Sequence, residues 1–217
     1  MRRVLVVSNN PTPYNDALFA RLAAEPGVDL LVAYATRSEP HREWRLPGDK
    51  GYAWRVMPGV TLGASTHLNP GAVPLVRRFR PQVAVLSGSY TMPTVPLAAL
   101  ALGRTPWVYW GEELAHGGAG PLRALARRLA RRTVLAAAGV LAIGSRAVRS
   151  YARAGVPPER IADFRYYADV AHFQLPEAAR CAARAEIRAA LGLAADRTVF
   201  LYCGQLVARK GVDTLLR

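Results

Sequence analysis

The stretch VLVVSNNPTPYNDALFARLA, residues 4–23, decides the fold of this chain. Residues 4–8 are an apolar, largely β-branched run, which predicts a strand buried on both faces. A loop rich in asparagine and proline follows, and apolar residues then recur at helical spacing over 14–25. The same succession of strand, polar loop and helix recurs along the sequence. It predicts an α/β fold, a Rossmann-like parallel sheet with helices on both faces.

The other predicted elements follow the same signals. Strands are expected at 30–34, 54–57, 83–86, 107–110, 140–143 and 161–166, and helices at 69–79, 92–103, 121–138 and 145–154. Asn69 before Pro70 predicts a helix N-cap, and Ser145 is predicted to cap the helix that follows it.

The sequence changes character after residue 170. Residues 1–170 are expected to form one Rossmann-like domain, and the alanine-rich residues 171–195 a helical linker. TVFLYCG, residues 198–204, restarts the strand pattern, so 196–217 is expected to be the incomplete start of a second domain. Because the predicted last helix stops at Arg217 after one turn, we expect the chain to be a fragment of a longer protein.

The formal net charge of +14 is compatible with a nucleic-acid or anionic-membrane partner. Lysine occurs only at Lys50 and Lys210, however, and the many arginines accompany a high alanine content that indicates compositional bias as readily as binding. We expect no nucleic-acid partner. Cys181 and Cys203 have neither metal nor disulfide spacing, and the apolar run 4–7 is too short for a secretion signal. We therefore expect a cytoplasmic location, and we expect no bound metal.

Two loops after predicted strands carry polar groups that suit a polyhydroxylated ligand. Asn9, Asn10 and Tyr14 lie in the loop 8–16, which can equally be an ordinary Asx-turn leading into a helix. Gly88 and Ser89 lie in the loop 87–93, where a glycine lets the backbone approach a ligand. A plain strand-to-helix turn explains the second loop as well.

The loop 109–116, YWGEELAH, brings two adjacent carboxylates to the end of a buried strand. Neighbouring residues in an extended chain point in opposite directions, so at most one is expected to face a cleft, and Glu112 is the choice. A carboxylate there can act as a general base or orient an acceptor hydroxyl. Two solvated loop acids are the alternative. The lone histidines His67 and His116 are more often structural than catalytic.

Residues 121–132 predict a basic amphipathic helix. Leu122, Leu125 and Leu129 fall on one face, and arginines at 123, 127 and 131 recur at every fourth position. Such a helix favours peripheral contact with the inner membrane surface, and a simply solvated face is the alternative.

The segment GQLVARKG, residues 204–211, predicts an anion site. A strand, a glycine turn, a basic loop and a helix beginning at Gly211 would place backbone amides and the Lys210 ammonium around a diphosphate. The spacing differs from that of a Walker loop.

Three segments, NNPTPYNDALFARLA, GVPPERIADFRYYADVAHF and YCGQLVARKGVDTLL, together resemble glycosyltransferase family 4 of the GT-B fold. The resemblance implies an acceptor-binding first domain and a second domain that binds a nucleotide-sugar donor. It implies roles for three groups of residues: catalysis by Glu112, acceptor binding by Asn9, Asn10, Tyr14, His67, Gly88 and Ser89, and donor-phosphate binding by Gly204, Arg209, Lys210 and Gly211. Gln205 departs from the family pattern, which often has arginine there.

The resemblance further implies transfer of a sugar, with retention at the anomeric carbon, from a nucleotide-diphosphate donor to a glycan or lipid-linked acceptor, without a cofactor or metal. The family's paired glutamates would lie beyond Arg217, so little activity is expected from the chain alone. The alternatives are a stand-alone sugar- or lipid-binding module or split-enzyme subunit, an epimerase of the same fold, and a nucleic-acid protein.

Overall fold

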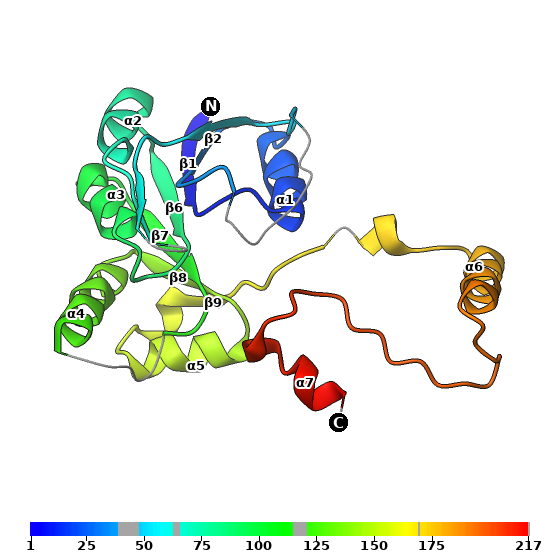
Figure 1. The fold of residues 1–217 in the computed structure, drawn as a ribbon. Helices are drawn as coiled ribbons and strands as arrows, with labels where there is room; N and C mark the ends of the chain where they lie inside the picture. The colour runs from blue at the N-terminus through cyan, green and yellow to red at the C-terminus, as the bar shows by residue number, and fades with distance from the viewer. Residues whose placement is uncertain (39–47, 63–65, 115–120, 169, 217) are drawn as a thin grey trace. The chain divides into compact units, whose positions relative to one another are not determined.

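The computed structural model describes residues 1–38, 48–62, 66–114, 121–168 and 170–216. They divide into two compact units, Met1–Ala168 and Asp169–Arg217, which are considered separately. The first unit contains the predicted sheet, with seven strands in the order β3-β2-β1-β6-β7-β8-β9 and every neighbouring pair parallel (Figure 1). The strands are β1 (Arg2–Ser8), β2 (Val28–Tyr34), β3 (Ala53–Val56), β6 (Val83–Ser87), β7 (Trp107–Gly111), β8 (Gly139–Ala142) and β9 (Ile161–Asp163).

Helices cover both faces of this sheet, which confirms the predicted Rossmann-like fold. Four of them, α2 (Ala72–Phe79), α3 (Thr94–Leu102), α4 (Pro121–Leu135) and α5 (Ser145–Arg153), contribute buried residues to one core cluster. Helix α1 (Pro13–Ala23) buries Phe19 against the opposite face, in a cluster with Val6, Val32 and Trp110. Alternate residues of the five inner strands, β2, β1, β6, β7 and β8, enter the two clusters, so both faces of the sheet are apolar there.

The helix starts differ from the prediction at two positions. Asn69 does not cap α2, whose N-cap is Gly71. The buried Asn69 amide instead donates to the carbonyl oxygens of Ala35 (2.9 Å) and Met57 (3.0 Å), because two backbone acceptors at the end of the sheet would otherwise lack donors. Ser145 is the first residue of α5 rather than its cap, and Gly144 occupies the cap position.

Helix α4 packs through a different face from the leucine stripe found in the sequence. Ala130 and Val134 are buried in the core, whereas Leu125 and Leu129 are each 53% exposed. Small residues allow α4 to lie close to the sheet, and the leucines are left on the outer surface beside the arginines.

A short hairpin that the sequence did not predict lies between β3 and α2. Strands β4 (Val60–Leu62) and β5 (Thr66–Leu68) pair antiparallel, with Thr61 opposite His67. His67 is buried in this hairpin, where one ring nitrogen contacts the Thr61 hydroxyl at 2.9 Å. Strands of three residues fall below the length at which alternation is visible in a sequence.

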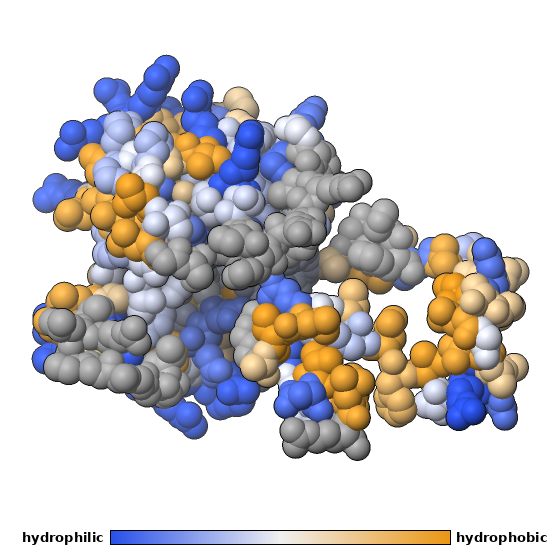
Figure 2. Space-filling model, viewed as in Figure 1, coloured by the Kyte–Doolittle hydropathy of each residue, from blue (hydrophilic) through white to orange (hydrophobic). Residues whose placement is uncertain are grey.

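The second unit contains a helix, α6 (Glu177–Ala190), and three short elements: η2 (Val170–Phe173), η3 (Ala208–Lys210) and α7 (Val212–Leu215). The prediction of a strand at 198–204 is wrong, because these residues form no strand in the structure. A strand requires a hydrogen-bonded neighbour, and none pairs with this stretch among the described residues. Phe200 and Leu201 are more than four-fifths exposed, and Figure 2 shows hydrophobic atoms on the surface of this unit.

A buried ion pair ties α1 to the outer strands of the first unit. The Lys50 ammonium, whose side chain is 3% exposed, contacts the Asp16 carboxylate at 2.5 Å. The Tyr52 hydroxyl donates to the other Asp16 oxygen and lies 2.7 Å from the Tyr34 hydroxyl. Burial, followed by the hydrogen bond to Asp16, raises the pKa of Tyr52 far above its usual value, so this network stays protonated on its tyrosines across the physiological range.

Replacing Asp16 with alanine is expected to destabilise the first unit by about 3–5 kcal/mol, because the Lys50 ammonium is left buried without its partner. The double variant Asp16→Ala/Lys50→Met removes the unpaired charge and should recover part of the loss. Urea unfolding followed by tryptophan fluorescence reports on this unit, since every tryptophan lies within residues 44–110.

The exposed Asp49 provides the control, because Asp49→Ala removes a carboxylate next to Lys50 in sequence without touching the buried pair. Equal losses for Asp16→Ala and Asp49→Ala would contradict the structural role assigned to the ion pair.

Candidate functional site

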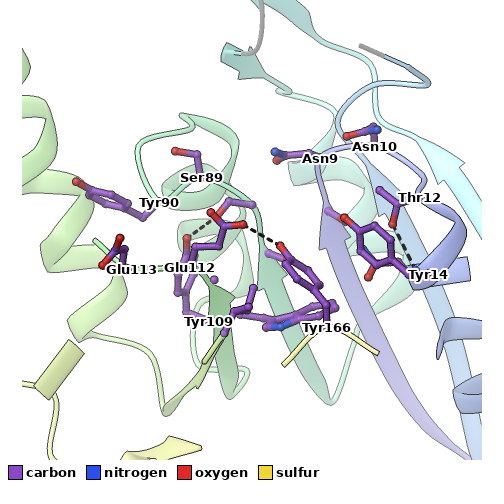
Figure 3. A pocket seen from close by; sticks show the side chains of 17 residues that line it. Asn9, Asn10, Thr12, Tyr14, Ser89, Tyr90, Tyr109, Glu112, Glu113 and Tyr166 are labelled. Carbon is purple, nitrogen blue, oxygen red and sulfur yellow. Dashed lines mark hydrogen bonds between the residues drawn. The ribbon is translucent and has the colours of Figure 1, made fainter. Parts of the chain in front are cut away.

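A cavity of about 320 Å³ opens at the carboxyl ends of β1, β6 and β7 (Figure 3). Three loops line it, within residues 8–15, 87–90 and 109–113, together with Ile143 and Tyr166. Strands β1 and β6 are neighbours, yet the chain leaves them toward opposite edges of the sheet. Loops that diverge in this way leave a crevice, which is the usual ligand site of an open parallel sheet.

Gly88 and Asn9 meet closely on the floor of this crevice. Gly88 has φ +122°, and a Cβ added there would lie 2.2 Å from the Asn9 side-chain oxygen. Only glycine satisfies both the backbone conformation and the space. The Asn9 oxygen is itself buried and accepts no hydrogen bond from any described residue, although buried acceptors usually have a partner.

The two carboxylates after β7 both line the cavity, although the sequence predicted that at most one would face it. The chain leaves extended conformation after Gly111, so strict alternation no longer applies. Glu112 is exposed and accepts a long hydrogen bond of 3.4 Å from the Tyr166 hydroxyl. Glu113 points away from Glu112 in Figure 3 and pairs with Arg146 of α5 at 3.0 Å. Glu112 is thus the carboxylate less committed to a cation.

Aromatic side chains form one wall of the cavity, and of these only Tyr14 was predicted from the sequence. The Tyr109 hydroxyl donates to the Gly88 carbonyl oxygen at 2.5 Å, and burial raises the pKa of Tyr109 well above its usual value. The Tyr14 and Tyr166 rings pack edge to face with centroids 5.1 Å apart. Trp110 also lines the cavity, and its buried indole N–H has no partner among the described residues. Aromatic residues at the ends of predicted strands were the available signal.

The structure brings most of the residues predicted for the first domain to one place. Asn9, Asn10, Tyr14, Gly88, Ser89 and Glu112 all line the cavity. His67 does not line it, because it is buried in the β4–β5 hairpin.

The residues predicted to bind donor phosphates lie in the second unit. Gly204 is in a bend, Arg209 and Lys210 are in η3, and Gly211 has φ +64° between η3 and α7. Helix α7 has only four residues, so it offers little of the helix dipole on which the predicted anion site depended.

The described part of the chain contains neither a metal-binding cluster nor a membrane-spanning helix. Within the described ranges, no group of three or more histidine, cysteine, aspartate or glutamate side chains is placed to hold a metal ion. No helix among these residues is long and apolar enough to cross a membrane.

Comparison with solved structures shows the fold. Alr3699/HepE from Anabaena, crystallised with UDP, aligns with a TM-score of 0.60 and 15% identity over 88% of this chain. The same protein crystallised with UDP and glucose gives a TM-score of 0.58 and 14% identity over 88% of the chain, and with UDP-glucose 0.57 and 16% over 88%. The chain shares its fold with these proteins over the aligned residues. The chain spans half the length of these proteins. No protein-family model and no curated protein matches its sequence.

The variant Gly88→Ala is expected to lower the free energy of unfolding by about 3 kcal/mol, since it adds backbone strain and a clash with Asn9. Gly103→Ala is the matched control: Gly103 also has positive φ (+58°), but a Cβ there meets nothing within 4 Å. Urea unfolding should show roughly half as large a loss for Gly103→Ala. Equal losses would mean that the Gly88–Asn9 contact contributes nothing.

Proposed function

We propose that this chain is the acceptor-binding part of a glycosyltransferase, which transfers a sugar from a nucleotide-diphosphate donor to an acceptor hydroxyl with retention at the anomeric carbon. The observation that carries the proposal is the polar, aromatic-walled cavity at the β1–β6 switch point of a glycosyltransferase-like fold. The complexes of HepE with UDP, UDP-glucose and glucose support the same ligand class.

The cavity contains the groups that carbohydrate recognition needs. Sugar hydroxyls both donate and accept hydrogen bonds, and the Asn9 side-chain oxygen and the Trp110 indole N–H are a buried acceptor and donor of that kind. The C–H faces of a sugar pack on aromatic rings, which Tyr14, Tyr109 and Tyr166 supply.

We assign to Glu112 the role of orienting the acceptor hydroxyl. Its carboxylate is exposed and lies beside the Tyr166 hydroxyl, so it can accept the proton of an incoming sugar hydroxyl and orient that oxygen for attack. In a full-length enzyme, Gly204, Arg209, Lys210 and Gly211 would stabilise the departing diphosphate, which is the main electrostatic demand of such a transfer. The assignment of this proposed enzyme to glycosyltransferase family 4 is supported by the motif resemblance.

A sugar-binding module or split-enzyme subunit without activity of its own is the second candidate. The cavity favours it in one respect, because every residue that lines it belongs to the first unit. Both candidates require carbohydrate binding, and only the first requires transfer by a longer protein.

Peripheral membrane contact through α4 is proposed on the exposed pair Leu125 and Leu129, which lie beside Arg128 and Arg132. Apolar and cationic side chains on one surface suit the interface of an anionic bilayer.

Glucose, UDP and UDP-glucose titrated separately into the purified chain test the proposal by saturation-transfer NMR. Glucose is expected to bind the wild-type chain, and Glu112→Gln to weaken that binding roughly tenfold, as for loss of a charged hydrogen-bond acceptor. Glu159→Gln is the control, because Glu159 is exposed and does not line the cavity.

Assay of UDP release from UDP-glucose completes the test. No turnover is expected from the 217-residue chain, and turnover with an acceptor is expected from a longer protein that contains it. Absence of glucose binding, or equal effects of the two glutamate variants, would refute the assignment of the cavity.

A further inference from the structure

A second cavity, also of about 320 Å³, lies between α4 and α5, and arginine is the commonest residue in its lining. Four arginine side chains line it: Arg127, Arg128, Arg131 and Arg153. Tyr90, Leu114 and Ser150 form part of the remaining wall, and no carboxylate is among the described residues that line it.

The sequence that forms most of this cavity is rich in arginine and contains no acid. Residues 114–158 include no aspartate or glutamate, and they carry eight arginines, at positions 123, 127, 128, 131, 132, 146, 149 and 153. The nearest acid in sequence, Glu113, pairs with Arg146 in the first turn of α5, whereas Arg153 lies in the last turn. Like charges that line one cavity repel one another, and a bound anion lowers that cost.

One of the four guanidinium groups is held in place by the backbone. Arg131 donates to the carbonyl oxygen of Ala154, the C-cap of α5, at 2.7 Å. A guanidinium carries five N–H donors, so this bond orients the side chain and leaves others for a ligand. Arg127 lies one turn before Arg131 on the same face of α4. The planar N–H forks of guanidinium groups match the oxygens of phosphate groups.

The arginine cavity adjoins the candidate sugar site. Tyr90 lines both cavities, and Leu114 of the second follows directly after Glu112 and Glu113 of the first. The backbone N–H of Leu114 donates to the Ser150 hydroxyl at 3.1 Å, which links the loop after β7 to α5. A ligand held by the sugar cavity can therefore extend an anionic group past Tyr90 toward the arginines.

We propose that the cavity between α4 and α5 binds the phosphate or diphosphate group of an acceptor whose sugar portion occupies the first cavity. This inference rests on the proposed function for the identity of the acceptor, whereas the anion site itself stands on the arginines. The phosphate can belong to a soluble sugar phosphate or to a lipid headgroup.

Two double variants with the same change in charge test the site. Arg128→Gln/Arg153→Gln removes two arginines that line the cavity. Arg78→Gln/Arg149→Gln removes two exposed arginines, from α2 and α5, that do not line it. Calorimetric titration with inorganic pyrophosphate, at an ionic strength fixed with sodium chloride, is expected to show binding by the wild-type chain and by the second variant. Binding by the first variant is expected to be roughly tenfold weaker or more.

Vesicles of phosphatidylcholine with and without phosphatidic acid identify the source of the phosphate. Selective loss of binding to phosphatidic acid in the cavity variant indicates a lipid headgroup, and pyrophosphate binding without vesicle binding indicates a soluble phosphate. Either result supports the site. Equal losses in the two variants would show a general effect of net charge and overturn it, as would absence of pyrophosphate binding by the wild-type chain.

Glucose titration of the cavity variant separates this inference from the proposed function. Retained glucose binding with lost pyrophosphate binding assigns the two ligands to the two cavities. Pyrophosphate binding by a wild-type chain that does not bind glucose would leave the anion site standing and remove only its link to a sugar acceptor.

Discussion

The parallel pairing of β1 with β6 is the contact on which the rest of the first unit depends. Val4 to Val7 pair with Val83 to Leu86, and the sheet grows outward from this pair in both directions. The crossovers on the two sides diverge, so the loops after Ser8 and Ser87 part and leave a cavity. Gly88 permits the close approach to Asn9 there. The Tyr109 hydroxyl, on the neighbouring strand β7, donates a hydrogen bond to the Gly88 carbonyl oxygen. The pairing of β1 with β6 therefore both organises the sheet and positions the loops that line the cavity.

The sheet was predictable because its signals are local and repeated. Every parallel strand was placed within a few residues, since a strand buried on both faces is an apolar run that a turn must interrupt. The roles of single polar residues were less predictable. Asn69 looks like a helix cap in sequence, but its amide is committed to the backbone of Ala35 and Met57, residues distant along the chain. Whether Asn69 caps a helix or bonds to a distant backbone depends on tertiary contacts, which the local spacing of residues does not reveal.

The residues of the candidate site were likewise predictable only in part. Asn9, Gly88 and Glu112 could be found because the ends of parallel strands share one edge of the sheet. Tyr166 and Trp110 were missed, because aromatic residues near strand ends are usually core. His67 was included by resemblance, and an unpredicted hairpin buries it elsewhere. The arginine cavity depends on the orientation of α4. The sequence predicted an amphipathic helix there but not which face packs on the core, where Ala130 and Val134 are buried.

The unpaired stretch 198–204 has a consequence for the behaviour of the chain in solution. TVFLYCG combines β-branched and aromatic residues with no charge, and it forms no strand among the described residues. Its backbone donors and acceptors are open to pairing with an identical stretch of another molecule, which is the route by which exposed edges self-associate. Arg197 and Arg209 are the nearest flanking charges. Concentrated solutions of this chain will therefore be limited by strand-to-strand association at this stretch, and a charge placed within it is the direct means of keeping the molecule monomeric.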